Sequence, residues 1–376
     1  MDSLAHSVAS SKLVSTPVFY GKRPWPGGPS IQQNWSLPNS MIFYIAKNPS
    51  NSKVYQKLVQ TCKFFFEKHP IIIMANLYTL ENGTKYHISQ NDRLDCLENK
   101  FECCINIDLN KLSTKICITK FLCIHKRIQN CIATIVQKNF RFEILCLCVN
   151  ENDIIFDDLK VLVSSAKRVY LFENSIKYKN GTNVMLDKIL ECLPSNIKYF
   201  SFWFRNDVSI VNASTMSNIL ELQNLENLKG FYLEECPDTL NVEDLSAFIK
   251  KFEHTRISLH FASNISEEYK EQLDSLINEI IESDAPDRLI KYDGQDQEKF
   301  KILISRFSMD FEDDEDEVEE INDGLDVENE TVADDKLEPD ETKPDQTELD
   351  ETGSGAGRIC CIAVLYNKIK NFFKSI

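Results

Sequence analysis

The chain has 376 residues, a formal net charge of −16 and a hydrophobic fraction of 43%. This length suffices for one large domain or two modest ones, and the hydrophobic fraction is that of a globular protein. The charge is local, because residues 310–351 hold 22 acidic and two basic side chains, while residues 1–309 hold 36 of each. A balanced surface lacks the basic excess of a nucleic-acid-binding protein, so we expect no nucleic-acid partner.

The 13 cysteines are scattered and form no Cys-x-x-Cys pair. Zinc sites need spaced pairs of thiolates or imidazoles, so we expect no metal and interpret most cysteines as buried side chains in a reducing compartment. The start of the chain shows no basic flank before an apolar core, and no run of about 18 apolar residues occurs. These features predict a cytoplasmic or nuclear protein.

Composition and hydrophobic spacing divide the chain into six parts. The first is rich in Ser, Pro and Gly, and the fifth has too few apolar residues to offset the entropy of folding. The predicted parts are a flexible tail (1–35), a helical unit (36–75), a connecting region (76–112), a strand–helix repeat domain (113–309), a disordered acidic linker (310–352) and a cationic amphipathic helix (353–376).

The helical unit begins at Leu37-Pro38, which fits a helix start with proline near the first turn. Apolar residues then follow at positions 41, 42 and 45, and again at 54, 55, 58, 59, 62 and 65. This three-to-four spacing is typical of amphipathic helices. The Asn, Pro and Ser residues at 48–52 predict a turn between two helices. A unit this short cannot bury its own apolar side chains, so it needs a partner.

Residues 113–309 predict an α/β fold in which strands and helices alternate. The strand starts lie 26 to 31 residues apart, and this period is typical of a leucine-rich-repeat-like solenoid with one parallel sheet. The strict leucine-rich pattern, with its ladder of Asn or Cys, is absent, and the alternative is an ordinary alternating α/β domain. The predicted strands are 115–124, 141–149, 168–172, 197–204, 228–233 and 256–261, and the predicted helices are 126–139, 157–166, 184–193, 215–225, 242–252 and 266–283.

Motifs of known enzyme chemistry are missing from the sequence. It has no glycine-rich phosphate loop, no His-Glu-x-x-His and no Gly-x-Ser-x-Gly. Acidic residues are dense only in 310–351, where carboxylates are too solvated for general acid–base work. We therefore expect no catalytic residues and no cofactor, and we interpret the chain as a binding protein.

The helical unit resembles an F-box. In that family Leu-Pro opens the first helix, and the second helix ends in Val-Cys-Lys followed by an aromatic residue. The segment Leu-Val-Gln-Thr-Cys-Lys-Phe-Phe-Phe at 58–66 is the nearest match. The whole arrangement looks like the roundworm F-box proteins that carry a divergent repeat domain. The chain departs from the family pattern at Ser40, Pro49, Lys53 and Thr61.

The resemblance implies a substrate-recognition subunit of a Skp1–cullin–F-box ubiquitin ligase. The helical unit would bind a Skp1-like adaptor, and the repeat domain would hold an unidentified client protein, while partners perform ubiquitin transfer. The alternative is a non-enzymatic interaction scaffold whose helical unit caps the first repeat. The residues expected at the adaptor interface are Leu37, Pro38, Ile42, Ile45, Val54, Leu58, Val59 and Phe65.

The C-terminal tip, residues 359–376, has apolar residues at spacings of three and four beside three lysines. Such a helix predicts peripheral contact with an anionic membrane surface. Cys360 and Cys361 are candidate acylation sites that would strengthen this anchor. The alternatives are docking of the tip onto the end of the repeat domain and pairing with a second copy.

Overall fold

The computed structural model describes residues 35–79, 86–89, 105–125, 130–204 and 208–308. Nearly all of these belong to one compact unit, Met1–Arg306. The predicted flexible tail up to residue 34, the acidic linker and the C-terminal helix with Cys360 and Cys361 lie outside the described residues.

The helical unit contains three helices, α1 (Asn39–Lys47), α2 (Ser52–Thr61) and α3 (Lys63–Lys68). The predicted second helix is divided at Cys62, whose backbone is extended with φ −156° and ψ 124°. The predicted end of the unit at residue 75 is also wrong, because a strand begins at residue 71. This strand's apolar residues are equally compatible with a helix by composition, and only pairing in a sheet decides between the two.

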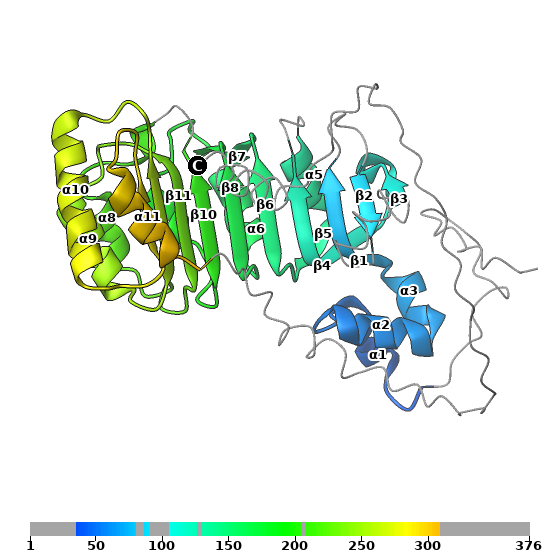
Figure 1. The fold of residues 1–376 in the computed structure, drawn as a ribbon. Coiled ribbons are helices and arrows are strands. Elements are labelled where there is room, and N and C mark those ends of the chain that lie inside the picture. Colours follow the sequence, from blue (N-terminus) through cyan, green and yellow to red (C-terminus); the bar gives the residue numbers. More distant parts are fainter. Residues whose placement is uncertain (1–34, 80–85, 90–104, 126–129, 205–207, 309–376) are drawn as a thin grey trace, which may run out of the picture. The chain divides into compact units, whose positions relative to one another are not determined.

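The fold is mixed α/β with a mostly parallel sheet of eleven strands among the described residues. Figure 1 shows the strands side by side in the order β13-β12-β11-β10-β8-β6-β4-β1-β2-β3, and β5 pairs with β4. The pairings of β1 with β2 and of β2 with β3 are antiparallel. The strands are β1 (Ile71–Thr79), β2 (Tyr86–Ser89), β3 (Ile105–Ile107), β4 (Lys115–Ile124), β5 (Asn139–Phe142), β6 (Cys146–Asn150), β8 (Arg168–Phe172), β10 (Tyr199–Trp203), β11 (Gly230–Cys236), β12 (Arg256–Phe261) and β13 (Arg288–Lys291).

Helices connect the parallel strands, as the alternation in the sequence predicts. They are α5 (Cys131–Lys138), α6 (Phe156–Val163), α7 (Leu186–Glu191), α8 (Thr215–Leu220), α9 (Val242–Lys251), α10 (Glu267–Glu282) and α11 (Gln297–Ser305). Short 3₁₀ turns lie at η1 (Leu109–Lys111) and η2 (Val208–Ile210). A separate two-stranded parallel sheet joins β7 (Asp153–Ile155) to β9 (Ser175–Lys177).

The predicted strand over 141–149 is wrong, because two strands occupy this region. Both β5 and β6 pair with β4, β5 along its first half and β6 along its second half. The backbone N–H groups of Glu143 and Leu145 also donate to carbonyl oxygens of β4. The register shifts by one residue between the pairing of Ile118 with Phe142 and that of Phe121 with Cys146, and this shift interrupts the strand. The strands and helices predicted from the sequence do not include β7, β9, β13 and α11.

The core lies between the connecting helices and one face of the sheet. Phe231 of β11 is fully buried, and its ring centroid lies 4.8 Å from that of Phe248 on α9. Phe261 of β12 contacts Tyr269 of α10 in the same way, at 5.6 Å. Because aromatic rings occupy these strand positions, each contact buries a large apolar area.

Side-chain amides link consecutive strand–helix units where the strands end. The Asn174 side chain accepts a hydrogen bond from the Asn152 backbone N–H (2.9 Å) and donates one to the Val149 carbonyl (2.8 Å). Both asparagines are buried. Asn152 and Asn174 thus form a pair of asparagines on consecutive units, although the sequence lacks the strict leucine-rich pattern with its repeated Asn or Cys. A buried N–H or carbonyl without a partner destabilises a fold, so these bonds hold the units together.

We predict that Asn174→Ala lowers the free energy of unfolding by about 3 kcal/mol, since it leaves a buried N–H and a buried carbonyl without partners. Chemical denaturation of the full chain measures this change. Asn227→Ala is the matched control, because its side chain is exposed and makes one bond to the Ser195 carbonyl. We expect the control to lose less than about 1 kcal/mol. Equal losses would contradict a special role for Asn174.

Candidate partner-binding surface

The helical unit carries large apolar side chains on its surface. Leu37, Met41, Phe43, Tyr44 and Val54 have 43%, 51%, 43%, 68% and 37% of their surface exposed. Among the described residues only three other large hydrophobic side chains are similarly exposed, Ile155, Val161 and Ile302, and none of them belongs to the helical unit. Exposed apolar side chains concentrated in one short segment are typical of an interaction site.

The residues predicted from the sequence divide into three groups. Leu37, Pro38 and Val54 are exposed, and Ile45, Leu58 and Val59 are half-buried. Ile42 and Phe65 are only 5% and 4% exposed, because they form the core of the helical unit with Ala46. These two residues stabilise the unit from within and present no surface to a partner. The proposed interface therefore excludes Ile42 and Phe65.

Met41, Phe43 and Tyr44 are exposed side chains that were not among the predicted interface residues. Ile42 and Ala46 are four residues apart and form the buried stripe of α1. Met41, Phe43 and Tyr44 lie beside this stripe and stay exposed. Five consecutive apolar residues at 41–45 are more than one helix stripe can bury. That excess is the signal in the sequence that could have identified them.

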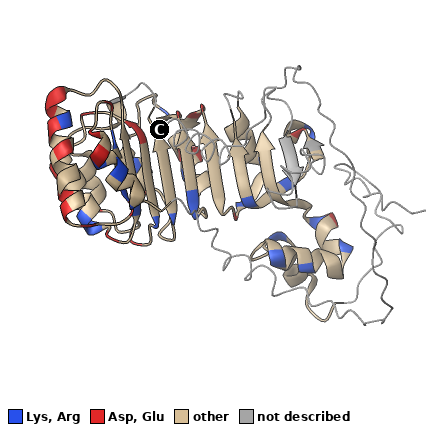
Figure 2. Ribbon diagram, viewed as in Figure 1, with Lys and Arg blue, Asp and Glu red and all other residues tan. Residues whose placement is uncertain are grey.

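The helical unit is also cationic. Between residues 37 and 69 it carries five lysines (47, 53, 57, 63 and 68) and a single acidic residue, Glu67. Figure 2 shows the basic residues along these three helices. Since complementary charges guide association and suppress wrong partners, an apolar surface with this surrounding charge suits an acidic partner.

Tyr55 attaches the helical unit to the sheet. Its hydroxyl donates to the His69 carbonyl (2.7 Å) and accepts from the Ile71 N–H at the start of β1 (3.0 Å). Its ring is buried against Ile71 and Cys117, and this burial raises the pKa of the Tyr55 hydroxyl to about 12. The hydroxyl therefore stays protonated and keeps donating at neutral pH.

A second attachment joins α2 to the segment between β5 and β6. The Ser52 backbone N–H donates to both carboxylate oxygens of Glu143, at 3.1 Å each. The contacts of the unit thus involve β1, β4 and Glu143, whereas β3 is the outermost strand at this end of the sheet. These contacts attach the helical unit to β4, the first strand of the predicted repeat domain.

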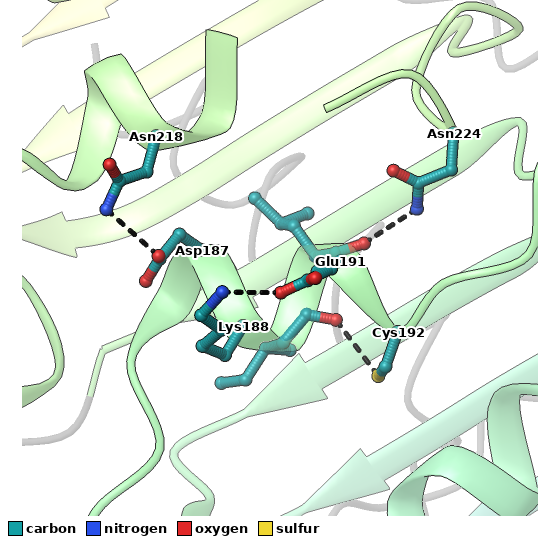
Figure 3. Close-up of polar contacts among 8 residues, drawn as sticks. Asp187, Lys188, Glu191, Cys192, Asn218 and Asn224 are labelled. Atoms are coloured by element: carbon teal, nitrogen blue, oxygen red, sulfur yellow. Dashed lines mark hydrogen bonds and ion pairs between the residues drawn. The ribbon is translucent and has the colours of Figure 1, made fainter. Parts of the chain in front are cut away.

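Polar side chains also gather between α7 and α8 (Figure 3). The Asn218 amide donates to the buried carboxylate of Asp187 (3.1 Å), and the Asn224 amide donates to the carbonyls of residues 190 and 193 (2.8 Å each). The Cys192 thiol donates to the Ile189 carbonyl, and burial raises its pKa to about 11. A protonated thiol is a poor nucleophile. The hydrogen bonds of Asn218 and Asn224 link neighbouring strand–helix units.

No family model, curated protein or solved structure matches this chain. Among the residues that the structure describes, no three His, Cys, Asp or Glu side chains are grouped to hold a metal ion. No helix in that part of the chain has the length and apolar character needed to cross a membrane. The surface of the helical unit is therefore the feature on which a functional proposal rests.

We predict that Tyr55→Phe lowers the free energy of unfolding by about 2 kcal/mol, because the buried Ile71 N–H loses its acceptor. Thermal or chemical denaturation measures this loss. Tyr44→Phe is the control, since Tyr44 is the most exposed of the large apolar residues, and we expect it to leave stability unchanged. A neutral Tyr55→Phe substitution would contradict the attachment described above.

Cysteine alkylation provides a pH-dependent prediction. Burial raises the pKa of the Cys117 thiol to about 12 and that of Cys192 to about 11. Alkylating reagents attack the thiolate, whose fraction falls about tenfold for each unit that the pKa rises. We expect both cysteines to stay unmodified in the native protein at pH 8 and to react fully in denaturant, as peptide mass spectrometry would show. Rapid native labelling of either would contradict these raised pKa values.

Proposed function

We propose that this protein is a substrate-recognition subunit of a Skp1–cullin–F-box ubiquitin ligase, with the helical unit as its adaptor-binding element. The observation that carries the proposal is the exposure of five large apolar side chains on a short helical unit. The Leu37-Pro38 start and the Cys62-Lys63 pair followed by aromatic residues resemble the F-box pattern. The receptor itself would perform no bond chemistry.

The exposed side chains suit a role as anchors in an adaptor interface. Leu37 precedes α1, and Met41 and Tyr44 lie on the same side of that helix, three residues apart. Large apolar anchors of this kind carry most of the energy of helix-mediated recognition. The five lysines of the unit would favour an acidic adaptor surface, so we expect its affinity to fall as salt is raised.

In the same proposal, the strand–helix units form a leucine-rich-repeat-like solenoid that holds the client protein. The strand order supports this, because β6, β8, β10, β11, β12 and β13 are neighbours in chain order. A doubly wound α/β domain instead reverses its strand order at a switch point. From β4 to β13 the sheet advances in one direction, and such a sheet offers an extended surface for recognition.

Skp1 binding by the full chain tests the proposal. We expect a complex with the unmutated protein, and we expect Leu37→Ala, Met41→Ala and Tyr44→Ala each to weaken it by about tenfold, as loss of an interface anchor does. Isothermal titration calorimetry measures the affinity. Circular dichroism establishes that each variant is folded, which is expected because all three side chains are exposed.

Val161→Ala and Ile302→Ala are the matched controls, since these side chains are 42% and 38% exposed on α6 and α11. They remove apolar area outside the helical unit, so Skp1 affinity should not change. No complex with the unmutated chain would overturn the adaptor role and would favour the interaction scaffold. Equal losses in the controls would show that the helical unit is not the interface.

A further inference from the structure

His69 lies at the joint between the helical unit and the sheet. It directly follows α3, and β1 begins two residues later (Figure 1). Its backbone N–H donates to the Phe65 carbonyl (3.1 Å), and its own carbonyl accepts from the Tyr55 hydroxyl (2.7 Å). The backbone of His69 is thus fixed to the helical unit.

The imidazole of His69 packs on the sheet. Its ring centre lies 5.1 Å from that of Phe140 on β5, and the two rings meet edge to face at 72°. Phe140 also packs against the buried cluster of Tyr55, Ile71 and Cys117. The His69 ring therefore lies beside the contact that attaches the helical unit to β1 and β4.

The surroundings of this ring suit a neutral imidazole and not an imidazolium. In the described part of the chain, Nε2 of His69 is buried without a hydrogen-bond partner. Burial lowers the pKa of His69, and the positive charges of Lys47 at the end of α1 and Lys115 at the start of β4 lower it further. A positive charge placed here would be buried, unpaired and next to two like charges.

Neighbouring side chains do not offset such a charge. On β5 the Arg141 guanidinium lies 6.0 Å from the centre of the Phe140 ring and adds positive charge. The Glu143 carboxylate is already engaged, because both of its oxygens accept from the Ser52 N–H and one lies 4.0 Å from Arg141. The acidic group closest in sequence to β5 thus has partners of its own.

The remaining titratable groups leave the charge of the joint unchanged in mild acid. Tyr55 and Cys117 stay neutral, because burial raises the pKa of each to about 12. Glu67 and Lys68 in the last turn of α3 are exposed, so solvent and salt screen their charges. His69 is therefore the group whose ionisation alters this contact.

The direction of the pH effect follows from the lowered pKa. In a detached helical unit the His69 ring is in water, where a histidine has a pKa of about 6.5. The attached state has a lower pKa, so the detached state takes up a proton first as the pH falls. Attachment is therefore complete above about pH 6.5 and weakens as the pH falls below that value.

We propose that His69 is a pH-sensitive switch in this joint, and that protonation of its ring in mild acid releases the helical unit from β1 and β4 while the strand–helix units stay folded. The switch goes beyond the adaptor role, because it concerns how the helical unit is held and not what it binds. It stands whether or not Skp1 binds.

Thiol labelling of the full chain tests the proposal. Cys117 reports on the joint, since it is buried with Tyr55 and Ile71, and Cys236, fully buried on β11, is the internal reference. A dipyridyl disulfide is the reagent, because its protonated leaving group departs readily in mild acid. We expect the modification of Cys117, measured by peptide mass spectrometry, to rise severalfold between about pH 7.5 and about pH 5. Cys236 should stay protected at both values.

His69→Gln removes the titration and keeps a polar side chain at the joint. Its ratio of Cys117 modification between the two pH values should be close to one. His254→Gln is the matched control, since the His254 side chain is 93% exposed, and it should behave like the unmutated chain.

Three outcomes would overturn the proposal. Cys117 of the unmutated chain could stay protected in acid, or Cys117 and Cys236 could become modified together, which would show unfolding of the whole chain. The His69→Gln variant could also keep the acid-induced rise. None of these measurements involves Skp1, so a failure of the adaptor role would be recognised separately.

Discussion

Backbone carbonyls of one strand–helix unit accept hydrogen bonds from side chains of the next unit along the chain. The Arg288 guanidinium is buried at the start of β13 and donates to the carbonyls of Phe252, Glu253 and Thr255 in the preceding unit. Asn224 and Asn174 do the same for earlier units. Buried carbonyls without partners are costly, so these side chains stabilise the contact between consecutive units.

The helical unit follows a different rule. It has a small core of its own around Ile42, Ala46 and Phe65, and Tyr55 joins it to the sheet. Ile42 is buried by other residues of the helical unit and not by the sheet. The exposed apolar residues beside it are therefore not needed to attach the unit to the sheet. Those residues remain exposed, and under the adaptor proposal they form the interface. The internal core gives stability, while the exposed residues are available for recognition.

Much of the fold could be predicted because its strands are long runs of apolar and aromatic residues with regular spacing. The predictions at 115–124, 168–172 and 256–261 match β4, β8 and β12. The prediction at 141–149 was wrong because β5 and β6 share one partner strand, and nothing local marks that sharing. β13 was missed because it is short and carries the buried Arg288, a residue that sequence patterns place on the surface.

The sequence by itself determined the alternation of strands and helices, the concentration of negative charge beyond residue 309, and the apolar excess at 41–45. These are properties of local composition and period. Only the tertiary structure decided which apolar side chains of the helical unit are buried, and that the His69 ring lies against Phe140. The reason is that burial and alignment depend on pairing between residues far apart in the sequence, and a linear pattern does not specify the register of that pairing.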